Sequence, residues 1–455
     1  MAAPSSRIFH ARSHACIHMH CLPCSVSTAC CILQAALLIT GATAMTYMRR
    51  LSGIVLTLSL GWWGPVHADA VTEWNAVTVS CVQGPVNANR SGPAGLLDIA
   101  LVQAAVHDAV QAIQGRFEPY AYENRAMRDV GSPAAAAAAA VYGMLTGLYG
   151  ADDPCLVNVT DPAITYAGDA GLQAGVEAAV ALLPFYRPTI TLPTDPFLGS
   201  QEPGQWRPTP NVTHGAGTFL AVTAPFAMKS PAQFRPASPP RLQSLRYWRD
   251  YHEVKKLGSN VNSTRTPQQT DTARFWTSNF FSQWNEALRR LAEERVHDIG
   301  DKARLFALVS FAAADSQISV YETKYVYNYW RPITAIQQGD SDGNVFTVGD
   351  PGWTPLIQTP PYPDYSSGAN CLAASIASVL RGFFGTDKVE LTVSSTATGL
   401  EVNPRTYRRL SDLEREMVEV RIWQGIHFRT AEEVGIDQGK RIGAWTLKKY
   451  LRPLR

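Results

Sequence analysis

The residues best suited to chemistry lie in three short segments of the last third of the chain. The first reads Lys324-Tyr-Val-Tyr-Asn-Tyr-Trp-Arg331-Pro332, with its two basic residues seven positions apart. At about 100° per residue, this spacing puts both charges on one face of a helix, which Pro332 would then end. Two cations with no acidic residue three or four positions away within this stretch, flanked by aromatic residues, suit a partly dry anion site. A surface pair whose aliphatic stems cover apolar neighbours is an equal alternative.

The second segment, residues 360–370, reads Pro-Pro-Tyr-Pro-Asp-Tyr-Ser-Ser-Gly-Ala-Asn and leads into a helical pattern. A Ser-Gly turn at a helix start presents backbone N–H groups and a hydroxyl to an anion, and the helix dipole adds to the attraction. Ser367 and Gly368 are therefore candidate ligands for an anion. Taken alone, the segment favours a simpler interpretation, in which the serine caps a helix and binds nothing.

The third segment, residues 421–429, reads Arg-Ile-Trp-Gln-Gly-Ile-His-Phe-Arg. Arg421 ends an amphipathic helical pattern, and Gly425 lets the chain turn so that His427 can face the same point. The segment predicts a cation and an imidazole at the anion site. A histidine of this kind is more often structural than a ligand, which is the alternative here.

In this order, the three segments resemble the signature of the vanadium-dependent haloperoxidases, within the type 2 phosphatidic acid phosphatase superfamily. That signature consists of Lys-x6-Arg-Pro, then Pro-Ser-Gly-His, then Ser-Arg-x3-Gly-x-His. The first motif is matched in full, and the intervals fit, with 33 residues between Pro332 and Ser366 and 51 between Ala369 and Arg421. Weaker similarities extend the resemblance over about residues 71–451.

The resemblance implies an all-α fold, a helical bundle of the vanadium haloperoxidase and acid phosphatase type. It also implies a bound orthovanadate, and phosphate, which has the same shape and charge, can occupy the same pocket. By this resemblance, Lys324, Arg331 and Arg421 would bind the vanadate oxygens. Ser367 Oγ and the Gly368 N–H would donate further hydrogen bonds to them. His427 would bind the vanadium through a ring nitrogen. The partners would be hydrogen peroxide and a halide or small organic acceptor, without haem, nicotinamide or nucleic acid. Such proteins often form homo-oligomers, but the sequence predicts no interface.

Three positions depart from the family pattern. Ala369 stands where the family has its acid–base histidine, and alanine cannot transfer a proton. Loss of a general acid–base typically costs about 10²–10⁴-fold in rate. Ser366 replaces the usual proline and Val420 the usual serine. The anion pocket is thus expected to be kept while its catalysis is impaired, because the neighbouring Asn370 cannot transfer protons at neutral pH.

Two other functions use the same residues. An acid phosphatase would employ His427 as a nucleophile on a phosphomonoester. Phosphatases of this pattern usually place an aspartate four residues later to orient that histidine, and here the position is Ala431, which favours the haloperoxidase. The third candidate is a phosphate- or vanadate-binding protein without catalysis, because of Ala369.

The elements that must position these segments are predicted to be mostly helices. Apolar periodicity indicates helices at 96–114, 133–148, 170–183, 270–294, 302–330, 371–384, 411–423 and 437–451, with Gly115 as a C-terminal cap. Residues 184–240 are rich in proline and glycine and predict a long ordered connection. Alternation over Val389, Leu391 and Val393 favours one short strand.

Composition and the N-terminal region bound the class of protein. The chain has 455 residues, 46% hydrophobic and 17% charged, with a net charge of +2, which excludes a disordered chain and gives no reason to expect nucleic acid. Residues 1–68 read as a leader, with a doubtful extension at 1–44 and a signal peptide at about 45–68. We therefore expect an exported protein, periplasmic or secreted.

The rest of the chain, residues 69–455, is expected to be one helical domain, with the motifs at about 300–450. No apolar run of 20 residues is apparent in it, so no membrane span is expected. Its cysteines are Cys81, Cys155 and Cys371, and a disulfide is most plausible between the first two.

Overall fold

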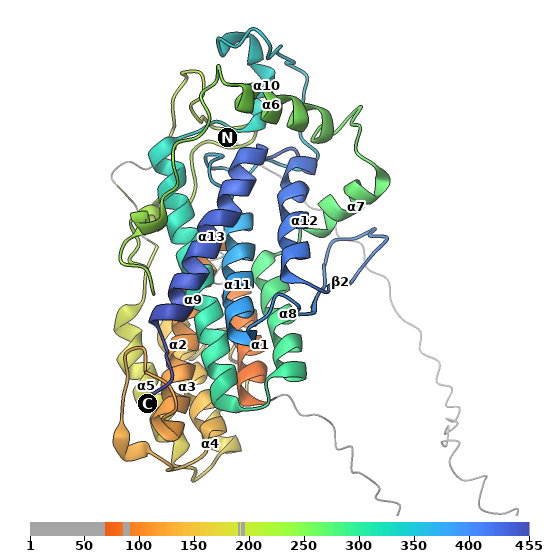
Figure 1. Cartoon of the computed structure of the whole chain (residues 1–455). Coiled ribbons are helices and arrows are strands. Elements are labelled where there is room, and N and C mark those ends of the chain that lie inside the picture. Colours follow the sequence, from red (N-terminus) through yellow and green to blue (C-terminus); the bar gives the residue numbers. More distant parts are fainter. Residues whose placement is uncertain (1–68, 85–91, 190–191, 193–195, 455) are drawn as a thin grey trace, which may run out of the picture. The chain divides into compact units, whose positions relative to one another are not determined.

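The computed structural model describes residues 69–84, 92–189, 192 and 196–454. The predicted leader, with its signal peptide, lies outside the described residues. The described residues form mainly helices (Figure 1), which confirms the predicted all-α fold. The α-helices are α1 Ala70–Gln83, α2 Gly95–Gln114, α3 Pro133–Tyr149, α4 Pro162–Thr165, α5 Gly171–Leu182, α6 Leu245–Leu257, α7 Pro267–Phe275, α8 Phe280–Arg295, α9 Ile299–Tyr327, α10 Pro332–Gln337, α11 Gly368–Phe384, α12 Leu410–Trp423 and α13 Arg429–Lys449.

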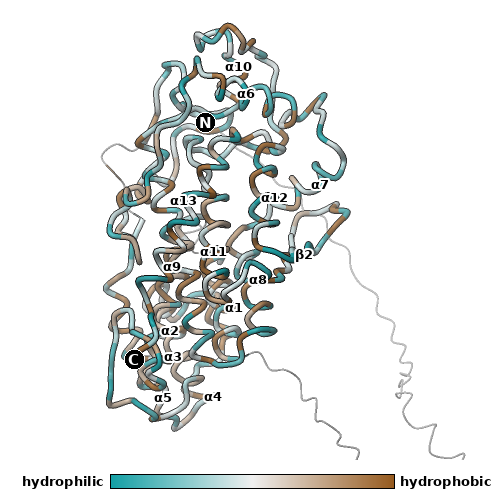
Figure 2. Tube along the Cα trace, viewed as in Figure 1, coloured by the Kyte–Doolittle hydropathy of each residue, from teal (hydrophilic) through white to brown (hydrophobic). Residues whose placement is uncertain are grey.

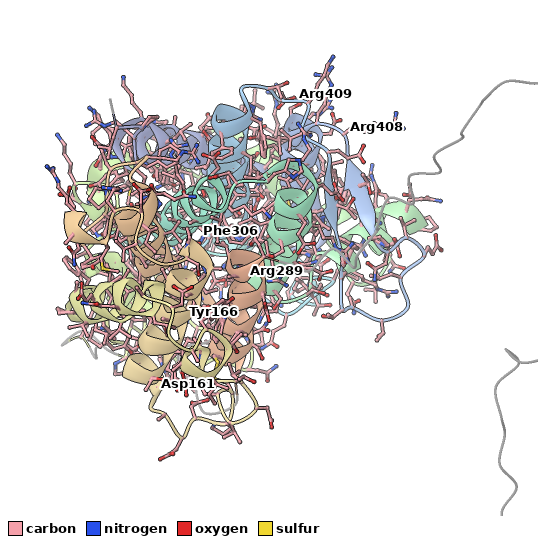
Figure 3. The ribbon with its side chains drawn as sticks, turned by 90° about the horizontal axis from the view of Figure 1, so that it is seen from below. Asp161, Tyr166, Arg289, Phe306, Arg408 and Arg409 are labelled. Atoms are coloured by element: carbon pink, nitrogen blue, oxygen red, sulfur yellow. A yellow bond between two sulfur atoms is a disulfide. The ribbon has the colours of Figure 1, made fainter. Side chains whose placement is uncertain are left out.

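The long helix α9 runs through the middle of the bundle. It contacts α2 on one side and both α11 and α13 on the other. Phe306 of α9 is fully buried and lies among the helices when the bundle is viewed from below, whereas Arg408 and Arg409 lie at its edge (Figure 3). Hydrophobic residues predominate along α2, α3 and α11, and hydrophilic ones along α6 and α7 (Figure 2). Burial of these apolar faces is the main stabilising contribution to the bundle.

Several predicted elements are confirmed with small shifts in their ends. Gly115 caps α2 in the left-handed conformation, with φ of 63°. The predicted strand is β1, Leu391–Val393, which pairs antiparallel with β2, Arg405–Tyr407. The expected disulfide between Cys81 and Cys155 is present and joins α1 to the segment after α3.

Other predictions of helix boundaries were wrong. The helix expected at 270–294 is interrupted after Phe275, and α8 starts anew where Asn279 Oδ1 accepts the N–H of Phe281. The last helix begins at Arg429 rather than at residue 437. Its glycines lower the helical propensity of the stretch, so the sequence pattern did not indicate the early start. Tertiary packing nevertheless keeps the stretch helical. Helices α1 and α6 were not predicted.

The proline- and glycine-rich connection between α5 and α6 is held against the bundle, as far as the described residues show. It contains two short 3₁₀ turns, Thr218–Val222 and Pro231–Phe234. The buried Asp315 of α9 accepts three backbone N–H groups of this connection, from Phe226, Ala227 and Met228, at 2.6–2.8 Å. One carboxylate therefore fixes the middle of the long connection to the central helix.

One stretch, Gly92–Gln114, is long and apolar enough to cross a membrane by length and composition, contrary to the expectation from sequence. The apolar window of this stretch is entirely buried inside the protein. It therefore has the surroundings of a core helix.

Helices α11 and α13 approach each other unusually closely, and this contact positions both ends of the site. Gly435, Gly439 and Gly443 stand four residues apart on α13 and face the backbone of α11. A Cβ added at Gly439 would lie 2.2 Å from the carbonyl oxygen of Cys371. Only a residue without a side chain allows the two backbones to pack at this distance.

We expect Gly439→Ala to lower the free energy of unfolding by about 1–3 kcal/mol, because the added methyl group forces α11 and α13 apart. Chemical denaturation followed by circular dichroism measures the loss. Gly352→Ala is the matched control, since a Cβ there would make only an ordinary contact of 3.7 Å with Asp350. Equal denaturation midpoints for both variants and the parent would contradict the close helix contact.

Candidate oxyanion site

A cavity of about 210 Å³ lies where α9, α11 and the end of α12 meet the loop before α11. Four of the six residues predicted from the sequence line it, namely Lys324, Gly368, Arg421 and His427. Arg331 and Ser367 are fully buried and do not line the cavity. The three sequence segments, which span about a hundred residues of chain, are thus brought together at one place.

Lys324 belongs to the last turn of α9 and is fully buried. Its ammonium group donates to the carbonyl oxygens of Pro363 and Asp364 at 2.8 and 2.9 Å, and Nζ lies 5.2 Å from the centre of the Tyr362 ring. These contacts tie the end of α9 to the loop before α11. They leave the ammonium group at the wall of the cavity.

Arg331 does not continue the helix of Lys324, so the prediction that both charges share one helix face was wrong. Helix α9 ends at Tyr327, and Asn328 follows in the left-handed conformation with φ of 47°. Arg331 is extended, with ψ of 155°, and precedes Pro332, the first residue of α10. The physical reason is that a proline disfavours the helical conformation of the residue before it.

The turn nevertheless brings the Arg331 guanidinium to the site from a second direction. Its Nε donates to the carbonyl oxygen of Tyr362 at 2.8 Å, and Nη1 donates to that of Ile426 at 2.7 Å. Nη1 also lies 3.1 Å from His427 Nε2. Arg331 therefore joins the loop before α11 to the loop before α13.

The N-terminus of α11 supplies backbone donors. Ser367 stands at the N-cap position, but its hydroxyl makes no capping hydrogen bond. Its N–H donates to Ala431 O at 3.0 Å, and the first hydrogen bond of the helix runs from Cys371 N to Ser367 O. The N–H groups of Gly368, Ala369 and Asn370 precede that bond, and helix N-termini attract anions through such groups.

Arg421 and His427 reach the cavity from the end of α12 and the following turn. Arg421 Nη1 donates to Gln424 Oε1 at 2.7 Å. Gly425 has φ of 80°, and a Cβ there would lie 2.3 Å from Gly258 O, so the predicted turn at this glycine is confirmed. His427 is 4% exposed at the cavity wall.

Two buried carboxyl groups at the site were missed by the sequence analysis. Asp364 Oδ1 lies 2.8 Å from His427 Nδ1 and 3.8 Å from Arg331 Nη1. Glu432 Oε1 lies 3.6 Å from the same histidine nitrogen. Both residues could have been found in the sequence, because Asp364 lies inside the second segment and Glu432 lies five positions after His427. The sequence analysis looked for an orienting carboxyl group only at the fourth position, which is Ala431. Their carboxyl groups surround the side of His427 that carries Nδ1.

The pKa values of these groups are shifted by their burial. Burial raises the pKa of Asp364 to about 7, and it raises that of Glu432 well above its usual value. Burial, together with the neighbouring Arg331, lowers the pKa of Lys324 and of His427 well below their usual values. All four shifts reduce the charge that the interior must hold. An oxyanion among the cations would favour the charged form of Lys324.

The donor set fits a tetrahedral oxyanion. Buried donor atoms without a hydrogen-bond partner, counted over the described residues, include Arg331 Nη2, Ser367 Oγ and Arg421 Nε. In the same part of the chain, no group of three or more His, Cys, Asp or Glu residues could hold a metal cation. The unpaired donors are those that an oxyanion would use.

Comparisons with known proteins agree with this architecture. The family model of the VCPO second helical-bundle domain matches residues 304–455. The vanadium chloroperoxidase of Curvularia inaequalis is 28% identical over 151 residues, which cover 27% of this chain and 24% of that protein. The chain thus spans about a quarter of the length of this curated relative.

Solved structures extend the likeness in fold over most of the chain. A bacterial vanadium-dependent iodoperoxidase has a TM-score of 0.70 at 23% identity, covering 84% of this chain and 97% of its own. A bacterial vanadium-dependent chloroperoxidase in its holo form has a TM-score of 0.66 at 16% identity, with the same coverage. The chain therefore has the fold of these vanadium-dependent haloperoxidases, and its last third matches the VCPO second helical-bundle domain.

Proposed function

We propose that the protein binds vanadate and oxidises a halide with hydrogen peroxide, as a haloperoxidase-like enzyme. The observation that carries this proposal is the convergence of Lys324, Arg421 and His427 on one cavity, with the Arg331 guanidinium 3.1 Å from His427 Nε2 and with buried donor atoms left unpaired. The identities to the solved haloperoxidases are too low to transfer an activity.

The residues that would hold vanadate are those that the sequence motifs predicted. Lys324, Arg331 and Arg421 would neutralise its oxygens, with Ser367 Oγ and the Gly368 N–H as further donors. When bound, vanadate supplies Lewis-acid activation of hydrogen peroxide toward the halide. The protein's part is to fix these donors beforehand, because preorganised charges cost no reorganisation during the reaction.

His427 is oriented for this role by its surroundings. Nδ1 faces the carboxyl group of Asp364, and Nε2 lies beside the guanidinium of Arg331. A proton on Nδ1 and a lone pair on Nε2 satisfy both neighbours, and the lowered pKa keeps the ring neutral at pH 7. A neutral imidazole with Nε2 unprotonated is the form that binds a metal.

Ala369 limits the rate that this arrangement can reach. It lies in the cavity wall, where it offers neither a proton nor a hydrogen bond from its side chain. Asn370 is buried, and its Nδ2 donates a hydrogen bond to Glu432 O at 3.3 Å. Its amide does not replace the missing acid–base group. We therefore propose that the enzyme is slow, because it keeps the residues that bind the anion but lacks the residue that transfers protons.

Acid phosphatase activity is the second candidate, and Asp364 is the observation that favours it. The sequence argument against it was the missing aspartate at position 431. Asp364, from another segment, approaches His427 Nδ1 at 2.8 Å and so provides the carboxyl group that a nucleophilic histidine needs. Binding without catalysis remains the third candidate, because of Ala369.

We also propose that the protein is exported. The disulfide between Cys81 and Cys155 supports this, because such bonds persist mainly in oxidising compartments. Export through the segment at 45–68 stays a prediction from the sequence.

The deciding experiment titrates orthovanadate into the protein by calorimetry and then assays bromide oxidation and phosphate-ester hydrolysis on the same sample. Vanadate binding together with peroxide-dependent bromide oxidation would support the haloperoxidase. Hydrolysis without bromide oxidation would support the phosphatase instead. Binding without either turnover would leave only the non-catalytic site.

We expect Lys324→Ala and Arg421→Ala each to weaken vanadate and phosphate binding about 10–100-fold. A hydrogen bond to a charged group contributes about 1.5–3 kcal/mol, and 1.4 kcal/mol corresponds to a factor of ten in affinity. Calorimetric titration measures the change, and Lys388→Ala, at an exposed position, is the control. Unchanged affinity in both site variants would rule out the proposed cradle.

We expect Ala369→His to raise the bromide oxidation rate by about 10²-fold or more, because it returns a general acid–base to the cavity wall. Ala369→Gln is the control, since it adds a polar side chain of similar size that cannot transfer a proton. Initial rates at saturating vanadate measure the effect. No difference between the two variants would show that proton transfer does not limit the reaction.

A further inference from the structure

The cavity is larger than an inorganic oxyanion requires. Its volume of about 210 Å³ is many times the ~10–15 Å³ that a cavity needs to hold one water molecule. Cavities that hold drug-sized ligands are larger, from about 300 Å³ upward. The space therefore matches a small ligand that extends beyond a single tetrahedral group.

The lining changes character along α9. Lys324, Tyr321 and Gln317 lie on one face of this helix at intervals of three and four residues, and all three line the cavity. The cation lies nearest the C-terminal end of the helix. The aromatic ring follows one turn earlier, and the amide lies a further turn away, where Gln317 Nε2 donates to Gly368 O at 3.1 Å.

Several apolar and aromatic side chains also line the cavity. Trp276 and Leu372 are 3% and 2% exposed and line the cavity, and Phe280 adds a third hydrophobic side chain. The Tyr321 and Tyr362 rings lie 5.2 Å apart at their centres in the same wall. We call the part of the cavity lined by Trp276, Phe280, Tyr321 and Leu372 the apolar compartment.

Ala369 lets the apolar compartment continue into the group of cations. It lies one helical turn before Leu372 on α11, and both residues line the cavity. A larger side chain at this position would take up part of the cavity that Ala369 lines. With alanine, the cations and the apolar compartment belong to one cavity.

We propose that this site binds an organic oxyanion, a phosphate monoester or phosphonate that carries one aromatic ring or an apolar group of similar size. The inference rests on the oxyanion cradle proposed above and names the ligand that fills the rest of the cavity. The charged head group binds among Lys324, Arg421 and His427. The ring lies in the apolar compartment, where its burial adds to the affinity.

Calorimetric titrations with phenylphosphonate and methylphosphonate test this, because the two ligands share one head group and differ in the ring. We expect phenylphosphonate to bind at least about tenfold more tightly. Equal affinities would overturn the organic ligand while leaving the cradle in place. Failure of both phosphonates and of inorganic phosphate to bind would overturn the cradle and the inference together.

Two variants locate the ring. Ala369→Leu should reduce the preference for phenylphosphonate to about threefold or less, because leucine fills the junction between the cations and the apolar compartment. Phe280→Ala should reduce it as well by removing part of the wall. Val326→Leu, which adds volume at a half-exposed position of α9 outside the cavity, is the matched control. A preference that stays unchanged in both cavity variants would contradict the proposed placement.

Discussion

The burial of two basic side chains, Lys324 and Arg331, at one place is the constraint on which the rest of the site depends. Lys324 and Arg331 are fully removed from water, and such charges are tolerated only when their donors find partners. The partners are carbonyl oxygens of residues 362–364 and 426, in the two loops that precede α11 and α13. The hydrogen bonds that keep the cations inside therefore also fix the loops that carry the remaining site residues.

The glycine-lined contact between α11 and α13 gives this arrangement its precision. Because Gly435 faces Ser367 O and Gly439 faces Cys371 O, the backbone at the start of α11 lies directly against α13. His427, which lies two residues before α13, is consequently held near the first N–H groups of α11. A site formed between two rigid helices can hold its donors in place without a ligand to order them.

The site combines features that favour binding with one that works against turnover. Asp364 and Glu432 surround Nδ1 of His427 and orient the ring, whereas burial and the neighbouring Arg331 lower the pKa of the imidazole. The side chain of Ala369, in the cavity wall, cannot donate a proton. Ala369 lines the cavity beside Gly368, and this position is the basis of both the slow turnover and the larger ligand that we propose.

The sequence alone indicated the helical class, the disulfide and all six candidate site residues, because motif spacing and apolar periodicity are local properties of the chain. Four of the six, namely Lys324, Gly368, Arg421 and His427, line one cavity in the structure. It could not show that α9 ends at Tyr327 and that Arg331 arrives from a separate turn. Nor could it show that Asp364, rather than a residue after His427, supplies the nearest carboxyl group. Tertiary structure decided these points, since burial and contact between distant segments select partners that sequence distance does not encode.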